Sequence, residues 1–119
     1  MLNKYKIGPK LIEFNGNYIL YEFIDGITLK EFIKTKKLTK SIIYDIKKQC
    51  KILDDLGINK MEMHRPLKNI IINKNKPTLI DFERCYYTKR PKNLNQFKEF
   101  LRRINIQDYR TMIRTNNFF

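Results

Sequence analysis

Cysteine, histidine and long apolar stretches are scarce in this chain. The only two cysteines, Cys50 and Cys85, have no metal-ligand spacing, and the only histidine is His64. No apolar run approaches the roughly 20 residues that a membrane-spanning helix requires, and the N-terminal residues lack the apolar region of a signal peptide. These absences argue against a cysteine metal site and a membrane partner. We therefore expect a cytoplasmic protein with reduced thiols, in which Cys50 is a core residue.

Glycine is also rare, and its spacing excludes one kind of phosphate site. The four glycines never form a Gly-x-Gly pattern, so the chain has no glycine-rich loop to cradle phosphates. Gly8 marks a predicted turn, Asn15-Gly16 predicts a hairpin turn, and Asp25-Gly26 predicts the end of a strand.

Basic residues dominate the charge of the chain. Among its 119 residues are 25 lysines and arginines and only 12 acidic residues, which gives a net charge of +13. A chain this basic attracts polyanions, which include RNA, DNA, nucleotides and acidic proteins. A solvated lysine-rich surface without any ligand explains the same composition, so charge alone does not choose a partner. The length fits a single domain over residues 1–119.

Short apolar runs and turn residues predict a β-hairpin and then a short helix. The strands of the hairpin cover residues 11–14 and 18–24. Thr28 then caps a helix over residues 29–34, with Glu31 at its third position.

A longer helix is predicted over residues 38–56. It begins at Thr39 or Ser41 and ends at Gly57. Its apolar residues recur at steps of three and four, as expected for one buried helical face. They are Ile42, Ile43, Ile46, Cys50, Leu53 and Leu56.

Two further expectations concern the end of the long helix and the last part of the chain. Asp54 and Asp55 lie in the last turn, where negative charge is unfavourable beside the helix dipole, so we expect them to pair with nearby lysines. Asn93 predicts the cap of another helix. A break at residues 105–107 and a final short helix from Asp108 complete an α+β fold that is mostly helical.

An asparagine and an aspartate flank a second predicted hairpin. Asn69 precedes an apolar strand, a turn over residues 74–77 follows, and Asp81 comes just after the second strand. A tight hairpin brings Asn69 and Asp81 to the same end of the strand pair. Their amide and carboxylate oxygens are hard ligands that suit Mg²⁺ with a nucleotide phosphate. An ordinary buried hairpin with polar ends is the alternative.

Four motifs in a fixed order give a resemblance to a known family. They are Gly8-Pro9-Lys10-Leu11, Arg65-Pro66-Leu67-Lys68, Ile80-Asp81-Phe82-Glu83 and Lys89-Arg90-Pro91-Lys92-Asn93. Over about residues 8–103 the chain resembles small predicted archaeal serine/threonine kinases related to RIO-type kinases. The resemblance implies a protein-kinase-like C-terminal lobe over residues 27–119. Residues 1–26 would then form a hairpin next to the hinge.

The same resemblance implies ATP and Mg²⁺ as cofactors. It makes Asn69 and Asp81 the metal ligands. Arg65 and Lys68 become phosphate-binding candidates, for which loop packing and solvation are the alternative roles. The hinge residues, whose backbone groups would hold adenine, are Glu22, Phe23 and Ile24.

Two residues compete for the role of general base in such a kinase. His64 lies five residues before Asn69, the spacing of the common kinase loop, and Glu62 fits a loop that is two residues longer. We favour Glu62, because a carboxylate orients a hydroxyl without being protonated near neutral pH. Histidine titrates near neutral pH and also suits this role, but His64 can equally be an ordinary surface residue.

Most of a kinase N-terminal lobe has no counterpart in this sequence. No glycine-rich loop, strand lysine or helix glutamate precedes the hairpin, and no Ala-Pro-Glu motif follows. The first hypothesis is a truncated, ATP- and Mg²⁺-dependent phosphotransferase that acts on a protein substrate. The second is an inactive pseudokinase-like module that binds RNA or a partner protein through its basic surface. In a third, a partner chain supplies or covers the missing lobe.

Overall fold

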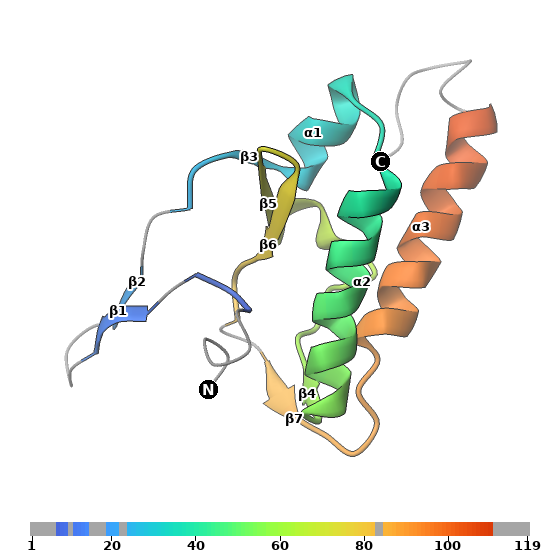
Figure 1. The fold of residues 1–119 in the computed structure, drawn as a ribbon. Helices are drawn as coiled ribbons and strands as arrows, with labels where there is room; N and C mark the ends of the chain where they lie inside the picture. Colours follow the sequence, from blue (N-terminus) through green and yellow to red (C-terminus); the bar gives the residue numbers. More distant parts are fainter. Residues whose placement is uncertain (1–6, 10, 15–18, 22–23, 83–84, 111–119) are drawn as a thin grey trace.

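The chain forms an α+β fold in which helices supply most of the regular structure. The computed structural model describes residues 7–9, 11–14, 19–21, 24–82 and 85–110. Its helices are α1 (Leu29–Thr35), α2 (Lys40–Asp55) and α3 (Asn93–Arg110), with a 3₁₀ helix, η2 (Pro66–Lys68). The strands are β1 (Leu11–Phe14), β2 (Ile19–Tyr21), β3 (Ile27–Thr28), β4 (Ile58–Asn59), β5 (Ile70–Asn73), β6 (Lys76–Leu79) and β7 (Tyr86–Tyr87) (Figure 1). The α+β class and the predominance of helix agree with the sequence prediction.

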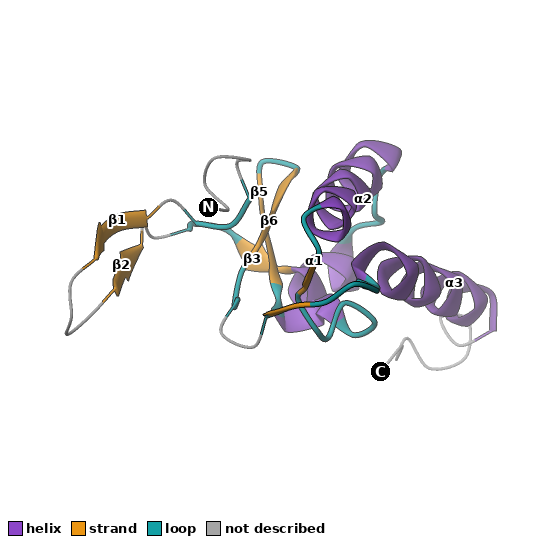
Figure 2. Cartoon of the chain, turned by 90° about the horizontal axis from the view of Figure 1, so that it is seen from below, coloured by secondary structure: helices purple, strands orange, loops and turns teal. Residues whose placement is uncertain are grey.

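Among the described residues, the strands form three small antiparallel sheets. β1 pairs with β2, β5 lies between β3 and β6, and β4 pairs with β7. The β1–β2 pair confirms the predicted N-terminal hairpin and stands away from the rest of the chain in both views (Figures 1 and 2). β3, β4 and β7 are too short to produce a sequence pattern and were not predicted.

Gly26 allows β3 to approach β5 closely. Ile27 pairs with Ile72 across the two strands. Gly26 has a φ of +133°, and a Cβ atom at this position would lie 2.4 Å from the carbonyl oxygen of Ile72. The backbone therefore requires glycine here, immediately before β3.

Both predicted threonine caps are present. The hydroxyl of Thr28 accepts a hydrogen bond from the Glu31 amide at 3.3 Å, and that of Thr39 accepts one from the Ile42 amide at 3.2 Å. The predicted face of α2 is buried, with Ile42, Ile46, Cys50 and Leu53 fully covered and Ile43 and Leu56 half-buried.

α2 lies at the centre of the fold, with α3 on one side and the β5–β6 hairpin on another (Figures 1 and 2). Gln49 of α2 donates a hydrogen bond to the Pro77 carbonyl oxygen of β6 at 3.1 Å. On α3, the rings of Phe97 and Phe100 lie 6.0 Å apart in the buried core. No helix in the described part of the chain is both long and apolar enough to cross a membrane.

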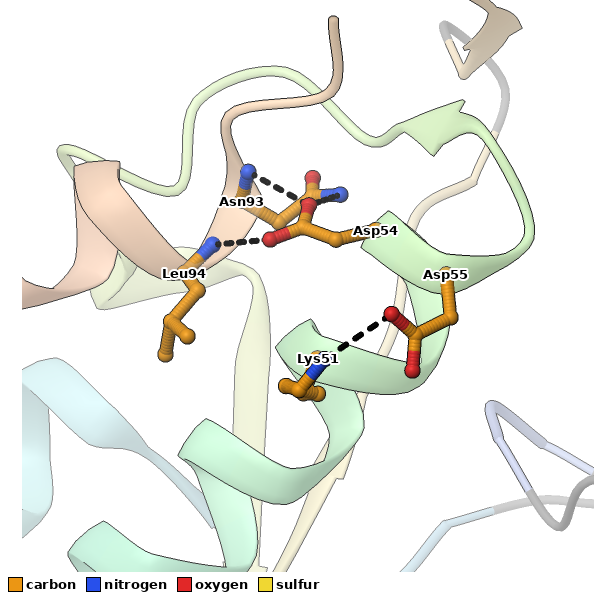
Figure 3. Close-up of polar contacts among 5 residues, drawn as sticks. All are labelled: Lys51, Asp54, Asp55, Asn93 and Leu94. Carbon is orange, nitrogen blue, oxygen red and sulfur yellow. Dashed lines mark hydrogen bonds and ion pairs between the residues drawn. The ribbon is translucent and has the colours of Figure 1, made fainter.

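Asp54 and Asp55 have different partners (Figure 3). Asp55 forms an ion pair with Lys51 at 2.9 Å, as predicted. Asp54 instead accepts hydrogen bonds from the backbone amides of Asn93 and Leu94 at 3.0 and 3.2 Å, and from the Asn93 side-chain amide at 2.9 Å. The prediction of a lysine partner for Asp54 was therefore wrong, because its carboxylate caps the first turn of α3.

Two other predictions near helix and strand ends were wrong. Asn93 begins α3 but does not cap it with its side-chain oxygen, which accepts a hydrogen bond from the Lys60 amide at 2.7 Å. The β5–β6 turn contains only Lys74 and Asn75, both with positive φ, so β6 already begins at Lys76.

The predicted helix break at residues 105–107 is absent from the described backbone. α3 continues through this segment to Arg110, because neither glycine nor proline interrupts it. Most of the final short helix predicted from Asp108 lies beyond residue 110, outside the described residues.

Burial of Cys50 leads to a prediction about thiol reactivity. Burial, with a contribution from nearby Asp54, raises the pKa of the Cys50 thiol from 9.0 to about 12. Since the thiolate is the nucleophile, Cys50 should not react with an aromatic disulfide reagent in the folded chain, whereas half-buried Cys85 should. The thiol stays protonated in the folded chain above the pH at which it ionises in the unfolded chain. The contribution of the Cys50 thiol to the free energy of unfolding is therefore complete below pH 9 and is lost as the pH rises toward 12.

Each thiol that reacts releases one coloured aromatic thiolate from the reagent, so absorbance counts the reactive cysteines. We expect one reactive thiol per native chain and two after denaturation. A Cys85→Ser variant should show no rapid reaction until it is unfolded. Fast reaction of that native variant would contradict the burial of Cys50.

Candidate functional site

The β5–β6 hairpin brings Asn69 and Asp81 to the same end of the strand pair, as predicted. Ile70 pairs with Leu79, and the Ile80 amide donates to the Asn69 carbonyl oxygen at 2.9 Å. Asp81 is the next residue after Ile80. The antiparallel register thus makes residues 12 positions apart in sequence neighbours at one edge of the sheet.

Glu62 reaches the same edge through a compact loop. The Asn69 side-chain amide donates a hydrogen bond to the Glu62 carboxylate at 3.3 Å. Within the loop, the Arg65 amide donates to the Glu62 carbonyl oxygen at 2.8 Å, and η2 completes the connection to Asn69. Asn69 is buried, whereas Glu62 is exposed.

Lys60 lies beneath this edge and was missed by sequence reasoning. It is only 2% exposed, and its ammonium group donates to the Asp81 carbonyl oxygen at 3.2 Å. The same group lies 5.0 Å from the centre of the Phe82 ring. Burial lowers the pKa of Lys60, and the nearby negative charges of Asp81 and Glu62 oppose that shift. Lysine is usually a surface residue, so no pattern in the sequence indicates its burial.

Backbone strain gathers at the same site. Met61, Glu62 and Asp81 have φ values of +68°, +61° and +66°. The other non-glycine residues with positive φ among the described residues are the two in the β5–β6 turn, where this conformation is expected. Side chains with Cβ atoms disfavour the left-handed region, and such strain is found most often at binding and catalytic sites.

The remaining predicted site residues occupy the loop or lie outside the described residues. His64, Arg65 and Lys68 are exposed, and the His64 carbonyl oxygen accepts a hydrogen bond from the Arg103 guanidinium. Glu62 forms a hydrogen bond with the Asn69 side chain, whereas the His64 side chain does not. Of the predicted hinge, Ile24 is half-buried, whereas Glu22 and Phe23 are not among the described residues.

Asn69 and Asp81 are too few protein ligands for a metal centre, so a metal ion at this site would need further ligands such as phosphate oxygens. Within the described part of the chain, no three His, Cys, Asp or Glu side chains gather as a metal site. Mg²⁺ in nucleotide sites typically takes only one or two carboxylates, with phosphate oxygens and water completing its shell. At such a site Asp81 would offer its carboxylate and Asn69 its amide oxygen, because the Asn69 nitrogen is bonded to Glu62. A metal centre made of protein ligands alone does not fit these residues.

No family model and no curated protein matches this chain. Function is therefore inferred from the geometry at the end of the β5–β6 hairpin.

Proposed function

We propose that this chain is a protein-kinase-like phosphotransferase module that binds ATP with Mg²⁺ at the end of the β5–β6 hairpin. The observation that carries the proposal is the hydrogen bond between Asn69 and Glu62 at the edge that also bears Asp81. The left-handed backbone at Glu62 and Asp81 supports it, because strained residues persist where function requires their geometry.

Each residue would have a distinct role. Asp81 and Asn69 would hold Mg²⁺, which together with ATP supplies the activated phosphoryl group. Glu62 would orient the attacking hydroxyl of a protein substrate and accept its proton. We favour Glu62 over His64 because the Glu62 carboxylate is hydrogen-bonded to the proposed metal ligand.

Further contacts would hold the nucleotide. Exposed Arg65 and Lys68 would bind its phosphates, and the backbone of residues 22–24 would hold adenine. Without a glycine-rich loop, we expect affinity in the range of about a millimolar, because a phosphate loop normally contributes several kcal/mol.

Calorimetric titration of ATP tests the nucleotide site. The intact chain should bind ATP with Mg²⁺ and should lose at least about tenfold in affinity when EDTA removes the metal or when Asp81 is replaced by alanine. Asp55→Ala is the matched control, because it removes the same charge from an exposed ion pair. Binding that ignores both Mg²⁺ and Asp81 would contradict the proposal.

A second candidate function is binding of RNA or a partner protein by a catalytically inactive module through its basic surface. The distribution of charge favours it. Most described lysines are exposed, whereas three of the acidic side chains, Asp54, Asp55 and Glu99, already pair with groups of this chain. Such binding should weaken steeply as salt rises.

A further inference from the structure

Residues 86–92, which comprise β7 and its connection to α3, form an exposed aromatic and basic segment. Tyr86 and Tyr87 are 49% and 72% exposed, although aromatic rings are usually covered. Lys89, Arg90 and Lys92 follow within five residues and are all exposed. We call residues 86–92 the aromatic–basic segment.

The backbone of this segment is fixed although its side chains are exposed. The Thr88 amide donates to the Gly57 carbonyl oxygen at 2.7 Å, and the Arg90 amide donates to the Thr88 hydroxyl at 3.2 Å. The Lys92 amide donates to the Asn59 side-chain oxygen at 2.9 Å. The segment therefore needs little ordering when it binds a ligand, which reduces the entropic cost of association.

Asn59 also fixes the first aromatic ring. Its side-chain amide donates to the Tyr86 hydroxyl at 3.3 Å, while its oxygen holds the Lys92 amide. One buried asparagine thus connects the aromatic end of the segment to its basic end. The Tyr86 hydroxyl and the Lys92 backbone amide are therefore held by the same side chain.

The charge around the segment is positive. From residue 85 to residue 98 the sequence contains no aspartate or glutamate. At the end of α2, Asp54 caps α3 and Asp55 pairs with Lys51. Lys89, Arg90 and Lys92 are exposed, so an external anion can reach them.

We propose that the aromatic–basic segment binds single-stranded nucleic acid. Lys89, Arg90 and Lys92 would neutralise phosphates, and bases would stack on the rings of Tyr86 and Tyr87. Consecutive strand residues point to opposite faces, so bases can flank both sides of β7.

Stacking requires unpaired bases, and an acidic peptide would gain nothing from the aromatic faces. The inference rests on the second candidate function and is independent of the nucleotide site.

Fluorescence anisotropy with a labelled 12-nucleotide oligouridine at low salt, about 50 mM, tests the proposal. Tyr87→Leu should weaken binding about tenfold, since one stacked base is lost. Replacing Lys89, Arg90 and Lys92 with glutamine should weaken it further and reduce the salt slope by about two. Tyr87→Phe should retain affinity, because the ring remains.

Matched variants place the same changes elsewhere. Tyr44→Leu removes another exposed tyrosine, and glutamine at Lys34, Lys37 and Lys40 removes the same charge from the region of α1 and the start of α2. Both should bind nearly as tightly as the intact chain, and circular dichroism would verify that every variant is folded.

The outcomes separate this inference from the candidate function on which it rests. Oligouridine binding that falls equally in the segment variants and their matched controls would refute the location and leave polyanion binding intact. No binding of oligouridine by the intact chain would refute the inference, and no binding of either oligouridine or duplex RNA would also remove RNA from the second candidate function. Equal affinity for an RNA duplex or a polyglutamate peptide would refute single-strand recognition.

Discussion

Replacing Asp54 with alanine should lower the free energy of unfolding by about 3 kcal/mol. The carboxylate accepts hydrogen bonds from the amides of Asn93 and Leu94 and from the Asn93 side chain. Asn93 is fully buried, so water cannot replace the lost acceptor there. Chemical denaturation followed by circular dichroism would measure the change.

The neighbouring residue provides the control. Asp55→Ala removes the same carboxylate from an exposed ion pair with Lys51 and should cost no more than about 0.5 kcal/mol. Asp54→Asn should fall between the two, because its single side-chain oxygen can replace only part of the cap. Equal destabilisation by Asp54→Ala and Asp55→Ala would show that Asp54 does not support α3.

Gly26→Ala should destabilise the fold by about 3 kcal/mol or more, since it combines a strained backbone with a steric clash. The new Cβ atom would lie 2.4 Å from the Ile72 carbonyl oxygen, and a φ of +133° disfavours any side chain. The contact is with backbone of β5, so no rotamer change relieves it. A lower midpoint of denaturant unfolding is the expected result.

Gly57→Ala tests whether the effect is specific. Gly57 also has a positive φ, +72°, but a Cβ atom there would meet only the Thr88 carbonyl oxygen at 3.2 Å. We expect a cost of about 1 kcal/mol at this position. If Gly26→Ala were no worse than Gly57→Ala, close packing of β3 on β5 would not be important for stability.

Local sequence patterns predicted the elements whose causes are local. Three features depend on residues that are close to one another in the sequence. They are the apolar spacing of α2, the threonine caps at the starts of α1 and α2, and the hairpin flanked by Asn69 and Asp81. Such features can be inferred without knowing what packs against them. The pairing of Asp55 with Lys51 belongs to the same class, because the two residues are one helical turn apart.

Features that depend on distant residues were not predictable in the same way. Asp54 caps a helix that begins 39 residues later, so only the packing of α2 on α3 reveals its partner. Lys60 is buried because Asp81, Phe82 and Asn93 surround it in the fold. The proximity of Glu62 to Asn69 depends on η2, whose three residues produce no recognisable period.

The Asn93 side chain links the helical part of the fold to the candidate site. It donates to Asp54 at the end of α2 and accepts from the Lys60 amide, while the Lys60 side chain holds the Asp81 carbonyl oxygen. These contacts make α2, α3 and the edge of the hairpin one cooperative unit. A ligand bound at Asp81 would therefore protect the distant first turn of α3 from opening, through thermodynamic linkage.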